Sequence, residues 1–298
     1  MEQLKQLLTA AGIAYKENEP LAAHSTFKIG GPARLFVQPV DHAQLCRTVA
    51  LCKAQSARYY LLGNGSNILF ADEGDNGVVL NISSMQDTVE VHGTQLTAGA
   101  GVRLSALCKT ALEHGLTGLE FAYGIPGTVG GAVYMNAGAY GGEMKDVLTT
   151  VQYLTAEGEV KEAAAAELDL RYRHSIFEEN GGCILSAQFA LTPGEPEAIR
   201  AKMDELMAKR LDKQPLDKPS AGSTFKRPVG AFAAALIDQC GLRGYRHGGA
   251  AVSEKHCGFV VNLGGATCAD VLALCEEVRT IVKEKTGYDL EKEIRVVR

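Results

Sequence analysis

The segment Gly124-Ile-Pro-Gly-Thr-Val-Gly-Gly-Ala-Val-Tyr-Met-Asn-Ala-Gly-Ala-Tyr-Gly-Gly-Glu143 is the most distinctive stretch of the sequence. It overlaps residues 121–142, a run of 22 residues without a formal charge, long enough to cross a bilayer as a helix. Seven glycines, Pro126 and Asn136 argue against such a helix, because a lipid-facing helix would form poorly with them. Glycine-rich backbone packed around a buried ligand tolerates the same composition. We therefore expect no membrane insertion here.

A second glycine loop, Gly63-Asn-Gly-Ser-Asn67, follows the apolar run 59–62, a pattern typical of a strand that ends in a tight loop. Both this loop and Gly99-Ala-Gly101 lack the third glycine of the dinucleotide fingerprint, and the sequence contains no Gly-Lys dipeptide of a P-loop. Successive N–H groups in a turn can bind an anion, and Ser66 and Asn67 add donors suited to a pyrophosphate. Either glycine loop alone is better explained as a plain tight turn. Two in one domain favour a large bound cofactor.

The length and net charge of the chain limit the number of domains and the kinds of partner that it can have. The chain has 298 residues, which predicts two domains or one large α/β domain, and a formal net charge of −5, which argues against non-specific nucleic-acid binding. Its eight cysteines contain no CxxC pair, so no metal site is expected, and we interpret them as buried thiols in a reducing cytoplasm. The first 12 residues are typical of an ordinary amphipathic helix and lack the features of a signal peptide.

The remaining pattern predicts a first part that mixes short strands with two helices, and a second part of the α+β class. Asp41 is expected to cap a helix, and Pro196 to stand in the first turn of another. The sequence Thr192-Pro-Gly-Glu-Pro196 marks the predicted boundary, giving domains 1–192 and 193–298. Strands are expected at 59–62, 78–80, 89–91, 96–98, 183–191, 258–262 and 294–297, with hairpins around His92-Gly93 and Glu157-Gly158. Helices are expected at 104–112, 196–211, 231–240 and 271–281.

Five blocks carry a family resemblance. They are the two glycine segments quoted above, Tyr172-Arg-His-Ser-Ile-Phe177, Gly222-Ser-Thr-Phe-Lys-Arg-Pro228 and Leu236-Ile-Asp-Gln-Cys-Gly-Leu-Arg-Gly-Tyr245. Together they span nearly the whole chain and closely resemble the UDP-N-acetylenolpyruvoylglucosamine reductase family, in the shorter form that lacks an extra tyrosine-bearing loop.

The resemblance implies an α+β fold: a two-subdomain FAD-binding domain of the vanillyl-alcohol oxidase (PCMH) type, at about 26–192 after the N-terminal helix, and a C-terminal α+β substrate-binding domain. It implies bound FAD and NADPH as co-substrate. No His or Cys lies in either glycine loop, so we expect non-covalent FAD, although His24 and the distant cysteines remain formal possibilities. The expected FAD-binding residues are Gly63, Asn64, Gly65, Ser66, Asn67, Ile68, Gly124, Ile125, Pro126, Gly127, Thr128, Gly130 and Gly131.

The implied reaction reduces the enolpyruvyl ether of a UDP-sugar to a lactyl ether in peptidoglycan precursor synthesis, which links the enzyme to cell wall biogenesis, cell shape and cell division. Ser223 matches the family's proton donor, and Arg173 and Glu293 match the other catalytic positions. Without the resemblance, Ser223 would be interpreted as a turn or cap residue and Arg173 as a surface or ion-paired residue. Glu291 is a close competitor of Glu293; we choose Glu293 because it directly precedes the terminal apolar strand. The family commonly has proline where this chain has Lys292.

Six basic residues between 209 and 227 face two acidic ones, an arrangement suited to a diphosphate. The resemblance places Lys213 at a substrate-binding position, and Lys226 and Arg227 flank the expected proton donor; a solvated basic face is the alternative for each. The histidines 174, 247 and 256 have no evident partner cluster in the sequence, so we expect structural or surface roles for them.

Two other classes of protein stay open at this point. One is a flavin oxidase that acts on an alcohol or sugar, which would need a base rather than the donors and positive charge offered here. The other is a non-catalytic module that binds flavin or a sugar nucleotide, which would not need three catalytic residues. The expected partners are the UDP-sugar and NADPH, without nucleic acid or membrane, and no oligomeric state is predicted.

Overall fold

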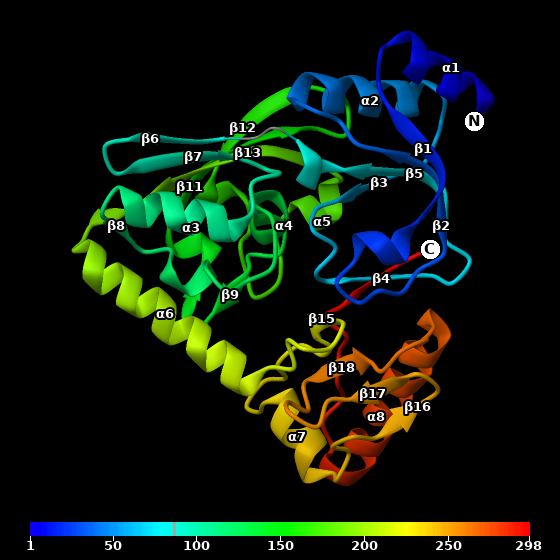
Figure 1. Ribbon diagram of the computed structural model, residues 1–298, viewed down its shortest axis with the longest axis vertical. Helices are drawn as coiled ribbons and strands as arrows, with labels where there is room; N and C mark the ends of the chain where they lie inside the picture. Colours follow the sequence, from blue (N-terminus) through cyan, green and yellow to red (C-terminus); the bar gives the residue numbers. More distant parts are fainter. Residues whose placement is uncertain (86–87) are drawn as a thin grey trace. The chain divides into compact units, whose positions relative to one another are not determined.

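The computed structural model describes residues 1–85 and 88–298. Its N-terminal part contains two helices that pack together and a four-stranded sheet of order β1-β2-β5-β3, in which β3 and β5 are parallel (Figure 1). Asp41 caps α2 as predicted, because its carboxylate accepts a hydrogen bond from the N–H of Gln44 at 2.7 Å. The elements are α1 (Glu2–Ala10), β1 (Tyr15–Pro20), η1 (Leu21–His24), β2 (Pro32–Val37), α2 (His42–Ala54), β3 (Tyr59–Leu62), β4 (Ile68–Phe70), β5 (Asp75–Asn81) and η2 (Ile82–Ser84).

A five-stranded antiparallel sheet of order β12-β11-β13-β7-β6 follows. Its outer pairs, β6 with β7 and β11 with β12, confirm the predicted strands at 89–91 and 96–98 and the hairpin at Glu157 and Gly158. Strand β13 lies at the centre, which explains its nearly continuous apolar sequence. The elements are β6 (Val89–His92), β7 (Gln95–Gly99), α3 (Leu104–Glu113), β11 (Leu148–Leu154), β12 (Val160–Ala164), η5 (Ala165–Glu167), α5 (Phe177–Asn180) and β13 (Cys183–Ala190).

The uncharged segment 121–142 folds into short pieces. Its α-helix, α4, packs against β13 and β7. Within the described residues, no helix has both the length and the apolar character needed to span a bilayer. The elements in and beside this segment are β8 (Leu116–Thr117), η3 (Glu120–Ala122), α4 (Val129–Tyr134), β9 (Gly138–Ala139), β10 (Gly142–Glu143), η4 (Met144–Asp146) and β14 (Thr192–Pro193).

The C-terminal part is α+β, as predicted. Helix α6 begins at Pro196, whereas α7 begins at Ala233, two residues after the predicted start, because Phe232 is still extended. Strands β15, β18, β17 and β16 form an antiparallel sheet, and α8 packs on β16 and β17 (Figure 1). The elements are α6 (Pro196–Lys213), β15 (Ser220–Ser223), α7 (Ala233–Gln239), β16 (Arg246–His247), β17 (Ala250–Val252), β18 (Phe259–Asn262), α8 (Cys268–Thr286) and β19 (Arg295–Val297).

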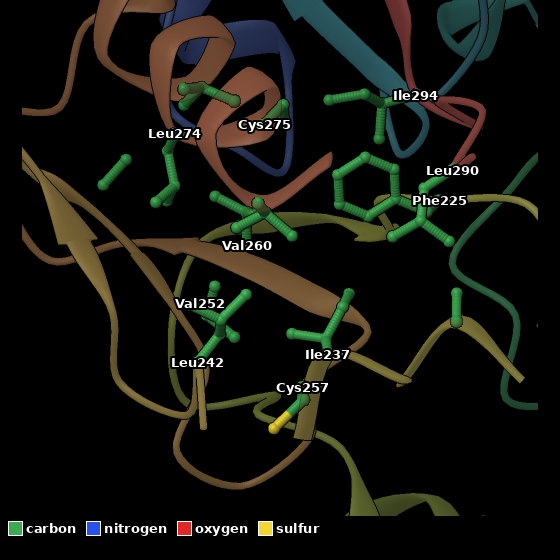
Figure 2. Packing of buried hydrophobic residues seen from close by; sticks show 14 of the residues in the cluster. Phe225, Ile237, Leu242, Val252, Cys257, Val260, Leu274, Cys275, Leu290 and Ile294 are labelled. Carbon is green, nitrogen blue, oxygen red and sulfur yellow. The ribbon is translucent and has the colours of Figure 1, made fainter. Parts of the chain in front are cut away.

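One apolar cluster forms the core of this part. Figure 2 shows Val252, Val260 and Ile237 on one side of the cluster and Leu274 and Cys275 of α8 on another. Phe225, Leu290 and Ile294 lie together within it and are 4%, 3% and 4% exposed, respectively. The burial of these three side chains fixes the two chain segments that carry Ser223 and Glu293.

The chain divides into two compact units that are interleaved along the sequence. The first consists of Met1–Lys16, Phe36–Asn64 and Gly77–Arg210, and the second of Glu17–Leu35, Gly65–Asn76 and Leu211–Arg298. The segment Gly65–Asn76 belongs to the second unit because its strand β4 pairs in parallel with the terminal strand β19. The division into a cofactor domain at 1–192 and a substrate domain at 193–298 describes function and stays a prediction.

Candidate active site

The first two residues of the loop 63–67 are joined to the loop that begins at Gly124, within the first unit. The side-chain amide of Asn64 donates a hydrogen bond to the carbonyl oxygen of Pro126 at 2.7 Å. A Cβ atom at Gly63 would lie 2.6 Å from Oγ1 of Thr128, closer than side-chain carbons approach an oxygen. Glycine at position 63 therefore permits the contact between the loops, a reason for it that the sequence did not reveal.

A third segment, 99–102, supports the second loop. The N–H groups of Gly130 and Val129 donate to the carbonyl oxygens of Ala100 and Val102 at 2.9 and 2.8 Å. A Cβ at Gly130 would lie 2.9 Å from that of Ala100. The Gly99-Ala-Gly101 pattern, which does not match the dinucleotide fingerprint, is thus a packing surface for the second glycine loop.

Several backbone donors of these loops have no protein partner. Among residues 1–85 and 88–298, no acceptor is found for the N–H groups of Asn64, Gly65, Ser66 and Thr128. Buried or half-buried N–H groups are normally satisfied, and three of these four are consecutive. A pyrophosphate supplies acceptor oxygens for N–H groups of this kind, so the residues of each loop, taken separately, fit the phosphate part of FAD.

A partly buried cation lies beside the second loop. The side chain of Arg210 is close to Gly124, where a Cβ would be 3.0 Å from its Cδ. Burial lowers the pKa of its guanidinium. Within the described residues no carboxylate pairs with it. Arg210 belongs to the basic run 209–227, and that run is the sequence signal that could have placed it on the candidate list.

The end of the first glycine loop contacts the segment that carries Glu293. In the second unit, the side-chain amide of Asn67 donates to the carbonyl oxygen of Glu293 at 3.3 Å, and the N–H of Arg295 donates to the carbonyl oxygen of Asn67 at 2.9 Å. Ile68 then pairs with Arg295 as β4 meets β19. This pairing, between residues more than 200 positions apart, brings a predicted FAD residue next to a predicted catalytic one.

Ser223 and Glu293 lie on adjacent backbone segments. The N–H of Glu293 donates to the carbonyl oxygen of Thr224 at 2.8 Å, and the N–H of Lys226 donates to that of Glu291 at the same distance. Thr224 is 1% exposed, and its hydroxyl accepts a hydrogen bond from the N–H of Val260 at 2.9 Å, which fixes the backbone beside Ser223.

This pairing also explains why Lys292 is tolerated where the family commonly has proline. Phe225 and Lys292 stand opposite each other, and the hydrogen bonds on either side come from Lys226 and Glu293. The N–H of Lys292 is not used in the pairing, so either residue type fits.

The three predicted substrate-binding residues occupy different surroundings in the second unit. Lys226 Nζ forms an ion pair with Glu291 Oε1 at 2.6 Å, and the guanidinium of Arg227 lies over the ring of Phe232, 4.5 Å from its centre. Lys213 is exposed at the last residue of α6. Glu291, the alternative to Glu293 for the catalytic position, is thus paired with Lys226.

Arg173 belongs to the first unit and has an unusual backbone. It is the third residue of a four-residue turn, which is closed by hydrogen bonds in both directions between the backbones of Arg171 and His174, and its φ is +55°. A type II turn requires positive φ at this position and usually has glycine there. A residue with a Cβ costs roughly 1–2 kcal/mol in this conformation. Its Nη2 donates to the carbonyl oxygen of Gly138 at 3.3 Å.

The expectation that His174 has no partner cluster is wrong. Its Nε2 lies 3.2 Å from Oδ2 of Asp169, and its Nδ1 lies 3.3 Å from Oε2 of Glu178. Asp169 also binds Arg171 at 2.6 Å. The partners stand four and five residues away along the chain, so the turn at 171–174 creates the cluster. His247 likewise has a partner, Glu277, at 2.8 Å.

The cysteines are buried as predicted, with the exception of the half-buried Cys46, and all eight are free thiols. Burial raises the pKa of Cys183 and Cys108 to about 12 and that of Cys52 to about 11. Within the described residues, no group of three or more His, Cys, Asp or Glu side chains is arranged to hold a metal ion.

Comparison with known proteins decides the family. A family model described as "FAD binding domain" matches residues 33–164, and one described as "UDP-N-acetylenolpyruvoylglucosamine reductase, C-terminal domain" matches 214–297. The chain is 49% identical to the UDP-N-acetylenolpyruvoylglucosamine reductase of Agathobacter rectalis over 99% of this chain and 96% of that one. It is 46% identical to that of Caldanaerobacter subterraneus over 100% and 97%.

The chain belongs to the UDP-N-acetylenolpyruvoylglucosamine reductase family. The structure is similar to the crystal structure of the reductase of this name from Thermus caldophilus, with a TM-score of 0.81, 35% identity, and coverage of 96% of this chain and 99% of that one. The predicted resemblance and fold class are confirmed: an FAD-binding domain is joined to the C-terminal domain of this family. As a member, the protein is an enzyme, a flavin-dependent oxidoreductase.

Proposed function

We propose that this family member reduces UDP-N-acetylglucosamine enolpyruvate to UDP-N-acetylmuramate, with NADPH as the electron donor and non-covalently bound FAD as the carrier. The support is the family membership together with one feature of the second unit. There, Asn67 of the FAD loop, Glu293 and the Ser223 segment are linked by consecutive hydrogen bonds. Residues that we propose to bind the cofactor and to act in catalysis, although remote in sequence, are thereby hydrogen-bonded to one another.

The two glycine loops supply the proposed FAD contacts. The unpartnered N–H groups of Asn64 and Thr128, both in the first unit, would hold the pyrophosphate, and the hydrogen bond from Asn64 to Pro126 would align the two loops for it. Bound FAD would supply hydride transfer from NADPH to the methylene carbon of the enolpyruvyl group. In this proposal the cofactor domain extends over 1–192 and the substrate domain over 193–298.

In this proposal, the protein's own side chains donate the proton to the substrate and stabilise the negative charge that develops on it. Hydride addition to the methylene carbon places negative charge on the substrate carboxylate, and the adjacent carbon must then receive a proton. We assign that proton to the hydroxyl of Ser223. The guanidinium of Arg173 would hold the carboxylate and bind it more strongly as its charge rises, and Glu293 would polarise it. Lys213, Lys226 and Arg227 would bind the diphosphate.

The product, a sugar nucleotide with a lactyl ether, is a precursor of peptidoglycan, so the proposal includes a role in cell wall biogenesis and, through it, in cell shape and division. Eight free thiols and the use of NADPH favour a cytoplasmic location.

An anaerobic titration tests the function. The purified protein should be yellow, NADPH should bleach it, and stoichiometric enolpyruvyl UDP-sugar should restore the colour. UDP-N-acetylglucosamine, which has the same nucleotide and sugar but no double bond, is the matched control and should leave the protein bleached. A protein bleached instead by an alcohol or a sugar and recoloured by oxygen alone would be an oxidase, and a colourless protein would contradict the proposal.

A further inference from the structure

The turn that carries Arg173 needs support from its surroundings. Its φ of +55° is unfavourable for a residue with a side chain, and conformations of this kind persist only where neighbouring contacts fix them. In a position expected to hold a substrate carboxylate, a loose turn would let the guanidinium move by an ångström or more.

Asn136 supplies one support. It is 0% exposed, and its Nδ2 donates to the carbonyl oxygen of Arg171 at 3.0 Å and to Oε2 of Glu143 at 2.9 Å. Its Oδ1 accepts a hydrogen bond from the N–H of Lys145 at 3.0 Å. The amide thus ties the first residue of the turn to the chain at 143–145 with three hydrogen bonds. Its own φ is +40°, a conformation that asparagine tolerates better than most residues.

Ser175 supplies a second support on the other side of the turn. Its side chain is buried, with 0% of the residue exposed, and its hydroxyl donates to the carbonyl oxygen of Tyr134 at 2.7 Å. Arg173 itself reaches the carbonyl oxygen of Gly138. The turn at 171–174 is therefore attached to the segment 134–138 before, at and after the arginine.

Glu143 connects the amide of Asn136 to the charge of Arg173. Its carboxylate binds Lys145 Nζ at 2.9 Å and accepts the Asn136 amide. The hydrogen bond from Lys145 is the main cause that lowers the pKa of Glu143, and the hydrogen bond from Asn136 and the charge of Arg173 add to it. The network therefore contains a negative charge that acts on the guanidinium as well as backbone contacts.

We propose that Asn136 is a positioning residue for Arg173, with Ser175 as a second anchor, and that the pair fixes the guanidinium for the substrate carboxylate. This inference rests on the catalytic role proposed for Arg173. Asn136 touches neither reacting atoms nor substrate in this proposal; it acts through the turn.

Asn136→Asp tests the proposal because it keeps the shape and the Oδ1 acceptor but replaces the NH2 donor by an oxygen that repels the carbonyl of Arg171 and the carboxylate of Glu143. We expect anaerobic reoxidation of the reduced flavin by saturating enolpyruvyl UDP-sugar to slow by roughly 10- to 100-fold, the size typical of a misplaced catalytic group. Bleaching by NADPH and the flavin spectrum should be unchanged. Ser175→Ala, a milder change, should slow the same half-reaction less.

Asn81→Asp is the matched control. Asn81 is also buried, at 6% exposed, and its Oδ1 accepts hydrogen bonds from the backbone N–H and the hydroxyl of Ser83, a residue of η2 that has no part in the hydrogen bonds of the turn. This variant should reoxidise at the normal rate. If it is slowed as much as Asn136→Asp, the effect is a general cost of a buried charge and the proposal is overturned.

The double variant Asn136→Asp/Arg173→Ala separates the positioning role from the proposed function. If Asn136 acts through Arg173, the double variant should be as slow as Arg173→Ala alone. If the rate reductions of the two single substitutions multiply in the double variant, the positioning role of Asn136 is overturned and the function of Arg173 is left in place. A normal reoxidation rate in Arg173→Ala would instead overturn the catalytic role of Arg173, and with it this inference. If Asn136→Asp does not fold, the same cycle with Ser175→Ala decides between these outcomes.

Discussion

The side-chain amide of Asn64 donates to the carbonyl oxygen of Pro126 at 2.7 Å and so joins two glycine loops 62 residues apart. The adjacent contact between Gly63 and Thr128 leaves no space for a Cβ. Because both loops are proposed to bind FAD, the join determines how their N–H groups are aligned. A change at this contact should therefore affect the cofactor before it affects the fold.

Gly63→Ala should weaken FAD binding by roughly 5- to 150-fold, since overpacking costs about 1–3 kcal/mol. Fluorescence titration of the deflavinated protein with FAD measures this. The clash is with Oγ1 of Thr128, so in a Thr128→Ala background the same substitution should have little further effect. An equal loss in both backgrounds would show that the glycine is needed for another reason.

Arg173→Gly should be more stable than Arg173→Ala by roughly 1 kcal/mol in urea unfolding. Both variants lack the guanidinium, so the comparison isolates the backbone at φ +55°, which glycine adopts without strain and alanine does not. Equal midpoints with equal m values would mean that the turn relaxes when the side chain is removed.

Much of the fold follows from local sequence rules, and the elements that were predicted show why. Asp41 and Pro196 each start a helix because a cap and a fixed φ act within one turn of the chain. The strands on either side of His92-Gly93 pair in the predicted hairpin for the same reason. These signals do not depend on distant partners.

The site depends on contacts that the sequence does not display. The turn at Arg173 has no glycine, so turn chemistry gave no signal of its positive φ. Asn136 was visible only as a polar residue inside an apolar segment, and its role depends on Arg171 and Glu143. The pairing of β4 with β19 is a long-range parallel contact, which no local pattern encodes. The catalytic candidates came from the family resemblance and remain predictions.

The thiols should be unreactive in the native protein. Seven of the eight cysteines are buried, and burial raises the pKa of several to about 11 or 12, so little thiolate forms near neutral pH. With a disulfide-exchange reagent such as DTNB at pH 8, we expect no more than the half-buried Cys46 to react within minutes, and all eight to react in urea. Rapid reaction of several native thiols would contradict the buried arrangement.

Acid should destabilise the protein partly through His256. Burial lowers the pKa of this side chain below its usual 6.5, so protons bind the unfolded state more readily. Its contribution to stability is present above pH 6.5 and is lost as the pH falls through the lower folded pKa. The ring accepts a hydrogen bond from the N–H of Gly258 at 3.1 Å and meets Phe259 edge to face.

Urea unfolding of the parent protein and of His256→Gln at pH 7.5 and pH 5.5 measures this contribution. The variant should be less stable at pH 7.5 but should lose less stability between the two pH values. A pH dependence identical to that of the parent would assign the acid sensitivity to other groups.

Ser223→Ala separates proton donation from electron transfer to the flavin. Bleaching by NADPH needs no proton from this hydroxyl, so its rate should be nearly unchanged. Reoxidation by the enolpyruvyl UDP-sugar requires protonation of the carbon beside the carboxylate and should slow by roughly 10²- to 10⁴-fold, about 3 to 5 kcal/mol of barrier. The backbone at this point is fixed by Thr224, Val260 and Glu293, so removal of one hydroxyl should leave the fold intact. Ser220→Ala, in the same strand β15, is the matched control and should behave as the parent protein. Stopped-flow measurement of the two half-reactions decides the matter, because an equal loss in both would mean that Ser223 supports the fold or the flavin and is not the acid.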